Sequence, residues 1–198
     1  MTGVAGRVIA GRAAGLRLAA PPDGTRPLAD RVKQTLFAIL EPGLPGSRFL
    51  DLCAGSGAGG IEALSRGAAG AVLVEQEQAA AQVIRDNLER THLAGPAARV
   101  VQAEAGAWLG SPEAVREGPF DFVLLDPPYH AESLLADLLA TLGDPARADL
   151  LRVEATVVAK HHRRTVPGAT IGLLRSVRER RFGETTLTFY RRVAMEDG

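Results

Sequence analysis

The chain has 198 residues, of which 46% are hydrophobic and 23% are charged, and its formal net charge is zero. This length suits one ordinary domain with a substantial core, and the composition is typical of a globular protein. No apolar run approaches the roughly 20 residues of a membrane-spanning helix, and no secretory signal is evident, so we expect no membrane contact. The single cysteine excludes an internal disulfide and a multi-cysteine metal site, and it indicates a cytoplasmic setting.

The first 40 residues predict a small N-terminal extension. Val8–Ile9 and Leu16–Leu18 predict the two short strands of a hairpin, with glycines near the bend. Residues 30–40 predict a helix, because apolar side chains recur there at helical spacing before prolines and glycines end it. We therefore expect two parts, the extension over 1–40 and a larger domain over 41–198.

Strands and helices alternate from residue 48 onwards. Apolar runs predict seven strands, at 48–53, 71–74, 99–102, 120–125, 151–159, 171–177 and 185–190. Helical patterns lie between the earlier strands, at 60–66, 78–91, 105–109 and 133–142. This order predicts an α/β fold with a mostly parallel seven-stranded sheet and helices on both faces. Ligands of such sheets bind beyond the carboxyl ends of the strands, where four acidic residues lie: Asp51, Glu75, Glu104 and Asp126.

A glycine-rich loop follows the first of these strands. Residues 55–60 match G-x-G-x-x-G between a strand and a helix, with Glu75 20 residues after Gly55, as in a dinucleotide fingerprint. Asp51 precedes the first glycine, where a carboxylate would repel a pyrophosphate but attract the sulfonium and ammonium of S-adenosylmethionine. We therefore favour S-adenosylmethionine as the cofactor. The predicted cofactor-binding residues are Asp51, Cys53, Ala54, Gly55, Ser56, Gly57, Glu75, Gln76, Glu104 and Ala105.

The sequence Asp126-Pro127-Pro128-Tyr129 follows the strand at 120–125 and predicts the catalytic loop. The amino group of a nucleobase is a poor nucleophile, because its lone pair is delocalised into the ring. Two acceptors aimed at its N–H groups would favour attack on a sulfonium methyl. The Asp126 side chain can supply one, and a backbone carbonyl of the rigid Pro127-Pro128 segment the other. Tyr129 can stack on a base taken out of its helix.

At these residues the chain resembles the amino methyltransferases with a D/N-P-P-Y/F/W motif, and within them the RsmD family. The resemblance extends from Arg7 to about Arg191 and is carried by the segments Arg7–Gly11, Asp51–Ala58 and Asp126–Pro128. It implies a Rossmann-like class I methyltransferase, with residues 41–198 as its catalytic domain. It further implies methylation of the N2 amino group of a guanine in 16S (small-subunit) rRNA, either bare or in an assembling small ribosomal subunit.

The resemblance also assigns roles and shows departures. It implies that Asp51, Gly55, Gly57 and Glu75 hold the cofactor, that Asp126, Pro127 and Tyr129 meet the amine, and that Arg26–Phe37 packs over the cofactor or the RNA. Four residues depart from the family pattern: Leu28 for Thr, Gln34 for Glu, Tyr129 for Phe, and Glu104 for a shorter Asp or Asn. The long Glu104 leaves its expected contact with the adenine open. We expect no metal requirement, since the histidines show no ligand spacing. We also expect a monomer.

Charge is unevenly distributed along the chain. The net charge is +4 over residues 1–35, −9 over 36–159 and +7 over 160–192. Basic ends that meet in space would attract a polyanion such as RNA, although any single arginine is more often a solvated charge than a contact. The candidate phosphate contacts are Arg7, Arg12, Arg17, Arg31, Lys33, Lys160 and Arg163, and a late hairpin adds Arg178, Arg180 and Arg181.

Three other interpretations stay open at this point. A DNA or RNA adenine-N6 or cytosine-N4 methyltransferase would use a similar catalytic loop. An NAD-dependent oxidoreductase would explain the glycine fingerprint, but Asp51 argues against it. A non-catalytic RNA-binding relative would not need Asp126. Asn87, on the helix after Glu75, could be either a structural amide or a residue of the site.

Overall fold

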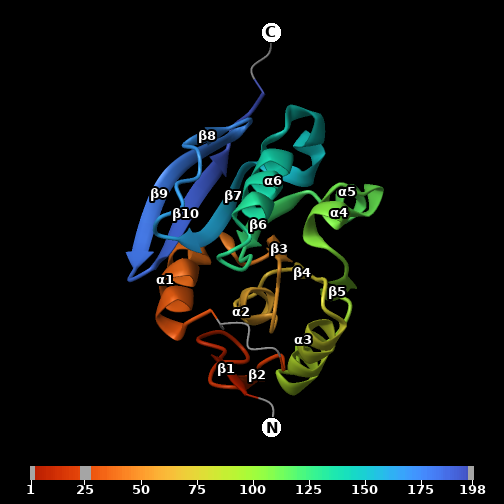
Figure 1. Cartoon of the computed structure of the whole chain (residues 1–198). Helices are drawn as coiled ribbons and strands as arrows, with labels where there is room; N and C mark the ends of the chain where they lie inside the picture. Colours follow the sequence, from red (N-terminus) through yellow and green to blue (C-terminus); the bar gives the residue numbers. More distant parts are fainter. Residues whose placement is uncertain (1–2, 23–27, 196–198) are drawn as a thin grey trace. The chain divides into compact units, whose positions relative to one another are not determined.

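The structure is a computed structural model of the chain (Figure 1). It describes residues 3–22 and 28–195. Residues 23–27, where Arg26 falls, lie outside the described part. The chain divides into two compact units, Met1–Glu104 and Ala105–Gly198. The expected extension over residues 1–40 lies inside the first unit, and its boundary at residue 40 stays a prediction.

The first unit opens with the expected hairpin, whose first strand lies closer to the N-terminus than predicted and whose second strand is shifted by one residue the other way. Strands β1 (Val4–Arg7) and β2 (Arg17–Ala19) pair in antiparallel fashion. The predicted strand residue Ile9 lies beyond the ladder, because its amide donates to a side chain, Glu62 Oε2, at 2.7 Å. Helix α1 (Asp30–Leu40) has the predicted bounds, and its apolar residues Val32, Leu36, Phe37 and Leu40 are buried.

A parallel sheet forms the centre of the first unit. Its strands are ordered β5-β4-β3, and every residue of β3 and β4 after the first is buried, as expected for strands covered on both faces. The bounds are β3 (Arg48–Leu52), α2 (Ala58–Ser65), β4 (Gly70–Glu75), α3 (Gln78–Arg90) and β5 (Ala98–Gln102), with a short 3-10 helix η1 (Glu41–Gly43) before β3.

The second unit combines parallel and antiparallel strands. Strand β6 pairs with β7 in parallel, and β10 lies antiparallel to β7 and to β9, which also pairs with β8. The bounds are α4 (Ala105–Leu109), α5 (Pro112–Glu117), β6 (Phe120–Leu125), α6 (Glu132–Gly143), η2 (Pro145–Leu150), β7 (Leu151–His162), β8 (Thr170–Ile171), β9 (Leu174–Phe182) and β10 (Thr185–Arg192).

The predicted α/β class is confirmed, and two details differ. Besides the hairpin there are eight strands in the described residues, not seven, because the expected strand at 171–177 is interrupted. Gly172 has a φ of +53° there, and the Leu173 amide donates to the Gly143 carbonyl at 2.7 Å, so the chain turns between β8 and β9. Helix α5 was not predicted, although Ser111 caps its first turn. No helix in the described residues is long and apolar enough to cross a membrane.

Candidate active site

The glycine-rich loop is tied to the end of strand β4. The Gly55 amide donates to Glu75 Oε2 at 2.8 Å, and the Ala54 amide donates to the Val74 carbonyl at 3.0 Å. Cys53 adopts a positive φ of 61°, a conformation that non-glycine residues rarely take and that is common near functional sites. Glu75 therefore holds the loop in place through its carboxylate.

Two glycines of this loop have different structural roles. A Cβ atom on Gly55 would meet nothing within 4 Å, and the φ of Gly55 is +56°, so the backbone there lies open to a ligand. A Cβ atom on Gly60 would come within 2.6 Å of the Leu73 side chain, so this glycine lets α2 pack closely on β4. The loop thus fits a cofactor that approaches its backbone at Gly55.

Asp51 is buried and contacts the start of helix α2. Its Oδ2 accepts a hydrogen bond from the Gly60 amide at 2.7 Å, which satisfies a donor in the first turn of the helix. A carboxylate oxygen has more than one acceptor site, so Asp51 and Glu75 can also bind cofactor groups. Two buried carboxylates beside an open glycine loop suit a ligand with cationic groups and ribose hydroxyls.

Asn87 connects this loop to the N-terminal hairpin. The amide is fully buried; its Oδ1 accepts from the Ala19 amide at 2.8 Å, and its Nδ2 donates to the carbonyls of Ala19 and Ser56 at 3.0 and 2.9 Å. Ser56 belongs to the glycine loop and Ala19 to β2. Asn87 therefore braces the loop against the hairpin, a role that the sequence left open.

The remaining predicted cofactor residues lie at different depths. Ala54 and Ser56 are buried within the loop, whereas Gln76 and Glu104 are exposed after β4 and β5. The Ala103 amide donates to the Glu75 carbonyl at 3.1 Å, which brings the residues after β5 to the end of β4. Ala105 is buried at the start of α4.

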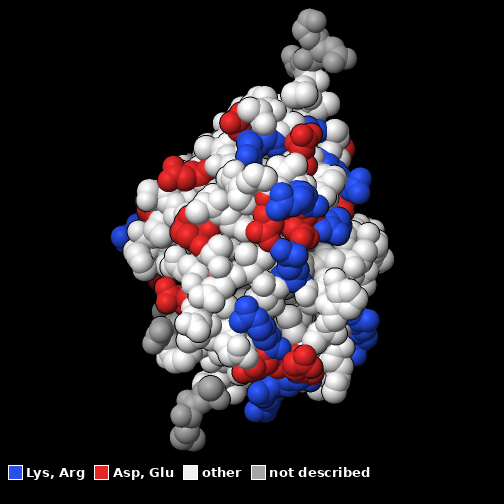
Figure 2. Space-filling model, turned by 90° about the vertical axis from the view of Figure 1, so that its right-hand side faces the viewer, with Lys and Arg blue, Asp and Glu red and all other residues white. Residues whose placement is uncertain are grey.

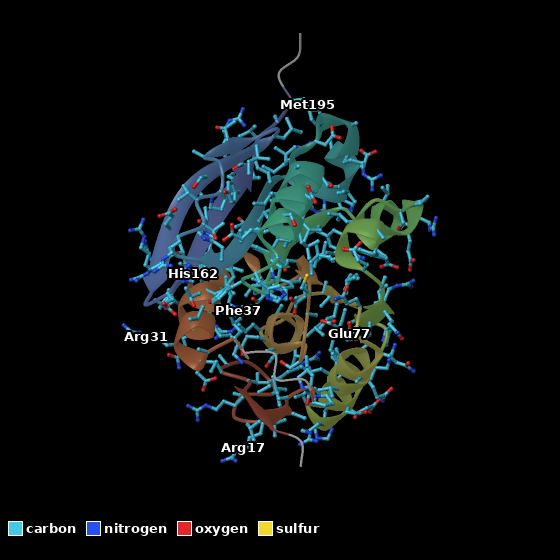
Figure 3. The ribbon with its side chains drawn as sticks, viewed as in Figure 1. Arg17, Arg31, Phe37, Glu77, His162 and Met195 are labelled. Carbon is cyan, nitrogen blue, oxygen red and sulfur yellow. The ribbon has the colours of Figure 1, made fainter. Side chains whose placement is uncertain are left out.

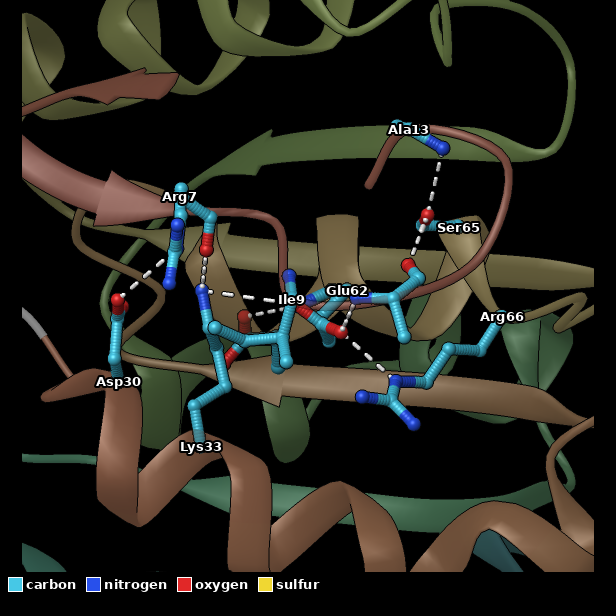
Figure 4. A network of polar contacts seen from close by, with 11 residues as sticks. Arg7, Ile9, Ala13, Asp30, Lys33, Glu62, Ser65 and Arg66 are labelled. Atoms are coloured by element: carbon cyan, nitrogen blue, oxygen red, sulfur yellow. Dashed lines mark hydrogen bonds and ion pairs between the residues drawn. The ribbon is translucent and has the colours of Figure 1, made fainter. Parts of the chain in front are cut away.

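Lys33 does not lie where a phosphate contact was expected. Its side chain is fully buried, and its Nζ donates to the Arg7 carbonyl at 2.5 Å and lies 3.6 Å from Glu62 Oε2 (Figure 4). Burial lowers the pKa of the Lys33 ammonium, and Glu62 partly offsets this effect. Glu62 also accepts from Arg66 Nε at 2.8 Å. This lysine is part of an internal network, which corrects the expectation from the sequence.

The other basic residues expected to contact RNA in the first unit are exposed. Figure 3 shows Arg17 of β2 and Arg31 of α1 pointing away from the ribbon. Arg7 pairs with Asp30 at 3.5 Å, and Arg12 is exposed in the bend of the hairpin. These side chains come from both strands of the hairpin, from its bend and from α1. The face drawn in Figure 2 shows acidic and basic side chains intermingled.

The catalytic loop begins with a nearly buried ion pair. Asp126 directly follows β6, and its Oδ1 contacts the Nζ of Lys160 on β7, with 18% and 11% of the two side chains exposed. Burial raises the pKa of the Asp126 carboxyl above its ordinary value, and the ammonium of Lys160 counteracts this. Lys160 was expected to contact phosphates, but its charged group is engaged by Asp126, because β6 and β7 are neighbouring parallel strands.

Tyr129 closes the loop and is held by residues of β7 and β10. Its hydroxyl shares a hydrogen bond with Thr185 Oγ1 at 2.5 Å, and its ring lies edge-on to His162 at 5.8 Å between centroids. The Lys160 Nζ lies 5.1 Å from the centre of the tyrosine ring. A pocket beside the loop is lined by residues of the loop, α6 and β7, including Pro127, Pro128, Tyr129, Glu132, Lys160 and His162. Arg163, just past β7, is exposed.

The site combines a glycine loop that has two buried carboxylates with a D-P-P-Y loop that follows a strand, both on an α/β fold. This combination defines a class I methyltransferase that depends on S-adenosylmethionine. The family model described as "Conserved hypothetical protein 95" matches residues 6–191, so the chain belongs to this family, and the predicted RsmD-like membership is confirmed.

Named relatives and a solved structure agree with this assignment. The chain is 37% identical over 187 residues to "Putative rRNA methyltransferase YlbH" of Bacillus subtilis (strain 168). This match covers 94% of this chain and 98% of that protein. It is 42% identical over 139 residues to "Ribosomal RNA small subunit methyltransferase D" of Escherichia coli (strain K12), covering 70% and 67%. The structure "Putative methyltransferase yhhF from Escherichia coli" matches 98% of this chain and all of its own, with a TM-score of 0.83 and 33% identity.

Proposed function

We propose that the protein transfers a methyl group from S-adenosylmethionine to the exocyclic N2 amino group of a guanine in small-subunit rRNA. The observation that carries this proposal is the D-P-P-Y loop, in which Asp126 and Tyr129 follow a strand of a methyltransferase fold. The names of the relatives support rRNA of the small subunit as the substrate class.

Asp126 and Pro127 of the loop each have a task in this reaction. S-adenosylmethionine, when bound, supplies a methyl group on a positively charged sulfur. The Asp126 carboxylate and the Pro127 carbonyl accept the two N–H groups of the amine, which frees its lone pair for attack. Transfer of the methyl group would leave the positive charge on the nitrogen of the amine, which would then have to lose one proton. Asp126 accepts this proton, and its raised pKa suits that role.

The rest of the chain supplies binding. We assign the cofactor to the loop residues 51–57 and to Glu75, whose buried carboxylates and open backbone support this assignment. The exposed arginines expected to contact phosphates remain proposed RNA contacts: Arg7, Arg12, Arg17, Arg31 and Arg163. We propose that the protein acts as a monomer in the cytoplasm and that residues 41–198 carry the catalysis.

A methyl-transfer experiment tests the proposal. The protein is incubated with methyl-labelled S-adenosylmethionine and three substrates: unmodified small ribosomal subunits, bare small-subunit rRNA, and duplex DNA. Digestion to nucleosides identifies the methylated base, with Asp126→Ala as the control. We expect N2-methylguanosine from a ribosomal substrate and its loss in the variant. N6-methyladenosine, N4-methylcytidine or labelled DNA would overturn the substrate, and full activity of the variant would overturn the role of Asp126.

A further inference from the structure

Strand β9 is rich in arginine, and beyond its pairing with the two-residue strand β8 it lies at the edge of its sheet. It pairs along its length with β10, whereas β8 pairs only with its first two residues, Leu174 and Arg175. Every residue from Val177 to Arg181 is exposed, including Val177 at 57%. Figure 1 shows this long strand as a blue arrow beside β10. Both faces of this strand therefore meet solvent.

Charged side chains on an edge strand can also serve to prevent pairing with strands of other chains. Charges of either sign, on either face of the strand, would serve that purpose. The arginines of β9 are not equivalent, however. Arg181 pairs with Glu179 at 3.2 Å, whereas neither Arg178 nor Arg180 has a carboxylate partner among the ion pairs of the described residues. Arg178 and Arg180 thus present charge that no carboxylate in the described part of the chain compensates.

The strand register shows which face these two arginines share. Residues directly opposite each other in an antiparallel pair project to the same face. Arg180 lies opposite Leu187 of β10, which lies opposite Lys160 of β7. Arg178 follows the same alternation, two residues along the strand. Both arginines therefore lie on the face of the sheet that carries Lys160.

The catalytic loop contacts this same face. Thr185, which binds the Tyr129 hydroxyl, lies opposite His162 of β7 and Phe182 of β9. Two strand spacings separate β7 from β9, or roughly 10 Å. Arg181 lies opposite Thr186, and Thr186 opposite His161, which puts Arg181 on the other face. The uncompensated charges of β9 are therefore on the side of the sheet where the target base is expected.

We propose that the face of β9 carrying Arg178 and Arg180 docks phosphates of the RNA strand that flank the target nucleotide. This inference rests on the proposed function, since it takes RNA as the substrate. Guanidinium groups bind phosphate oxygens in bidentate geometry, and such contacts position a nucleic acid without reading its sequence. Binding to this face sets the register in which the target base reaches Tyr129.

Neighbouring arginines on opposite faces provide a matched test. The variants are Arg178→Gln, Arg180→Gln and the control Arg181→Gln, each of which removes one charge from an exposed position. The affinity for bare small-subunit rRNA is measured at several salt concentrations. We expect Arg178→Gln and Arg180→Gln each to weaken binding and to reduce the slope of log K against log salt by about 1, whereas Arg181→Gln leaves both unchanged.

Two outcomes would overturn this proposal, and they separate it from the proposed function. An equal effect of all three variants would show that total charge matters and not a docking face, and no effect of Arg178→Gln or Arg180→Gln would remove the contact. In either case, intact methyl transfer leaves the proposed function in place. A wild-type protein that binds no small-subunit rRNA and methylates none would overturn both. Methyl-transfer kinetics give a second measure, because a docking contact changes KM for RNA more than kcat.

Discussion

Asp126 is a carboxylate on which burial and a neighbouring cation act in opposite directions. Burial raises the pKa of the carboxyl, and the ammonium of Lys160 lowers it, with burial the larger effect. The carboxylate form is the one that can accept an N–H group. Lys160, although not expected at the reaction centre from its sequence position, therefore helps to keep Asp126 ionised. Around the same loop lie Tyr129, Glu132 and His162.

We predict that Lys160→Met moves the acid limb of the kcat profile to higher pH. Activity falls as pH drops through the pKa of Asp126, and loss of the ammonium lets burial raise this pKa further. Lys160→Arg keeps the charge and should remain near the wild type. The control Arg116→Met removes an exposed charge from α5 in the same unit.

Titration of the carboxyl carbon of Asp126 by NMR checks the same effect without catalysis, with Asp126→Asn to assign the signal. If this titration has the same midpoint in the wild type and in Lys160→Met, Lys160 has no part in setting the ionisation of Asp126.

At the scale of elements, one buried carboxylate joins three parts of the first unit. Glu62 of α2 accepts the amides of Ile9 and Ala10 after β1, at 2.7 and 3.0 Å, and it pairs with Lys33 of α1 and Arg66 (Figure 4). Helix α2 follows the glycine loop directly. The N-terminal extension is thereby attached to the helix that begins at the cofactor loop, and Asn87 makes a second attachment from α3.

We predict that Lys33→Met lowers the free energy of unfolding by about 3 kcal/mol. Removal of one member of a buried ion pair leaves its partner poorly compensated, and the Arg7 carbonyl also loses a donor. The control Arg31→Met lies on the same helix but is exposed, and it should change stability by no more than about 0.5 kcal/mol. Urea unfolding followed by circular dichroism measures both. Equal, small effects would mean that the network does not stabilise the unit.

At the scale of the whole molecule, the thermal stability of the protein with each candidate ligand shows which cofactor it binds. A ligand that binds only the folded protein stabilises it by about 2.7 kcal/mol at 100 times its Kd. We predict that S-adenosylhomocysteine raises Tm by roughly 5–11 °C at that concentration, and that NAD at equal concentration does not. Glu75→Ala should remove the shift, because the glycine loop loses its anchor. Stabilisation by NAD and not by S-adenosylhomocysteine would instead indicate a dinucleotide site.

The sequence by itself determined most of the fold and the chemical type of each loop. The bounds of α1, α4 and β6 agree with the apolar periodicity, because that signal is local to each element. The glycine fingerprint and the D-P-P-Y run are also local, since each depends on backbone geometry within a few residues. Helix α5 was not predicted, although Ser111 followed by Pro112 is a helix-start signal that is equally local.

Only the tertiary structure decided what the buried polar side chains do. Lys33 bonds to a residue 26 positions away, Lys160 to one 34 away, and Asn87 to one 68 away. From the sequence, both lysines were indistinguishable from the solvated arginines around them, and Asn87 from a surface amide. No periodicity encodes such pairs. A buried polar group must find a partner wherever the fold places one, so its role follows from the packing of distant elements and not from its neighbours in the chain.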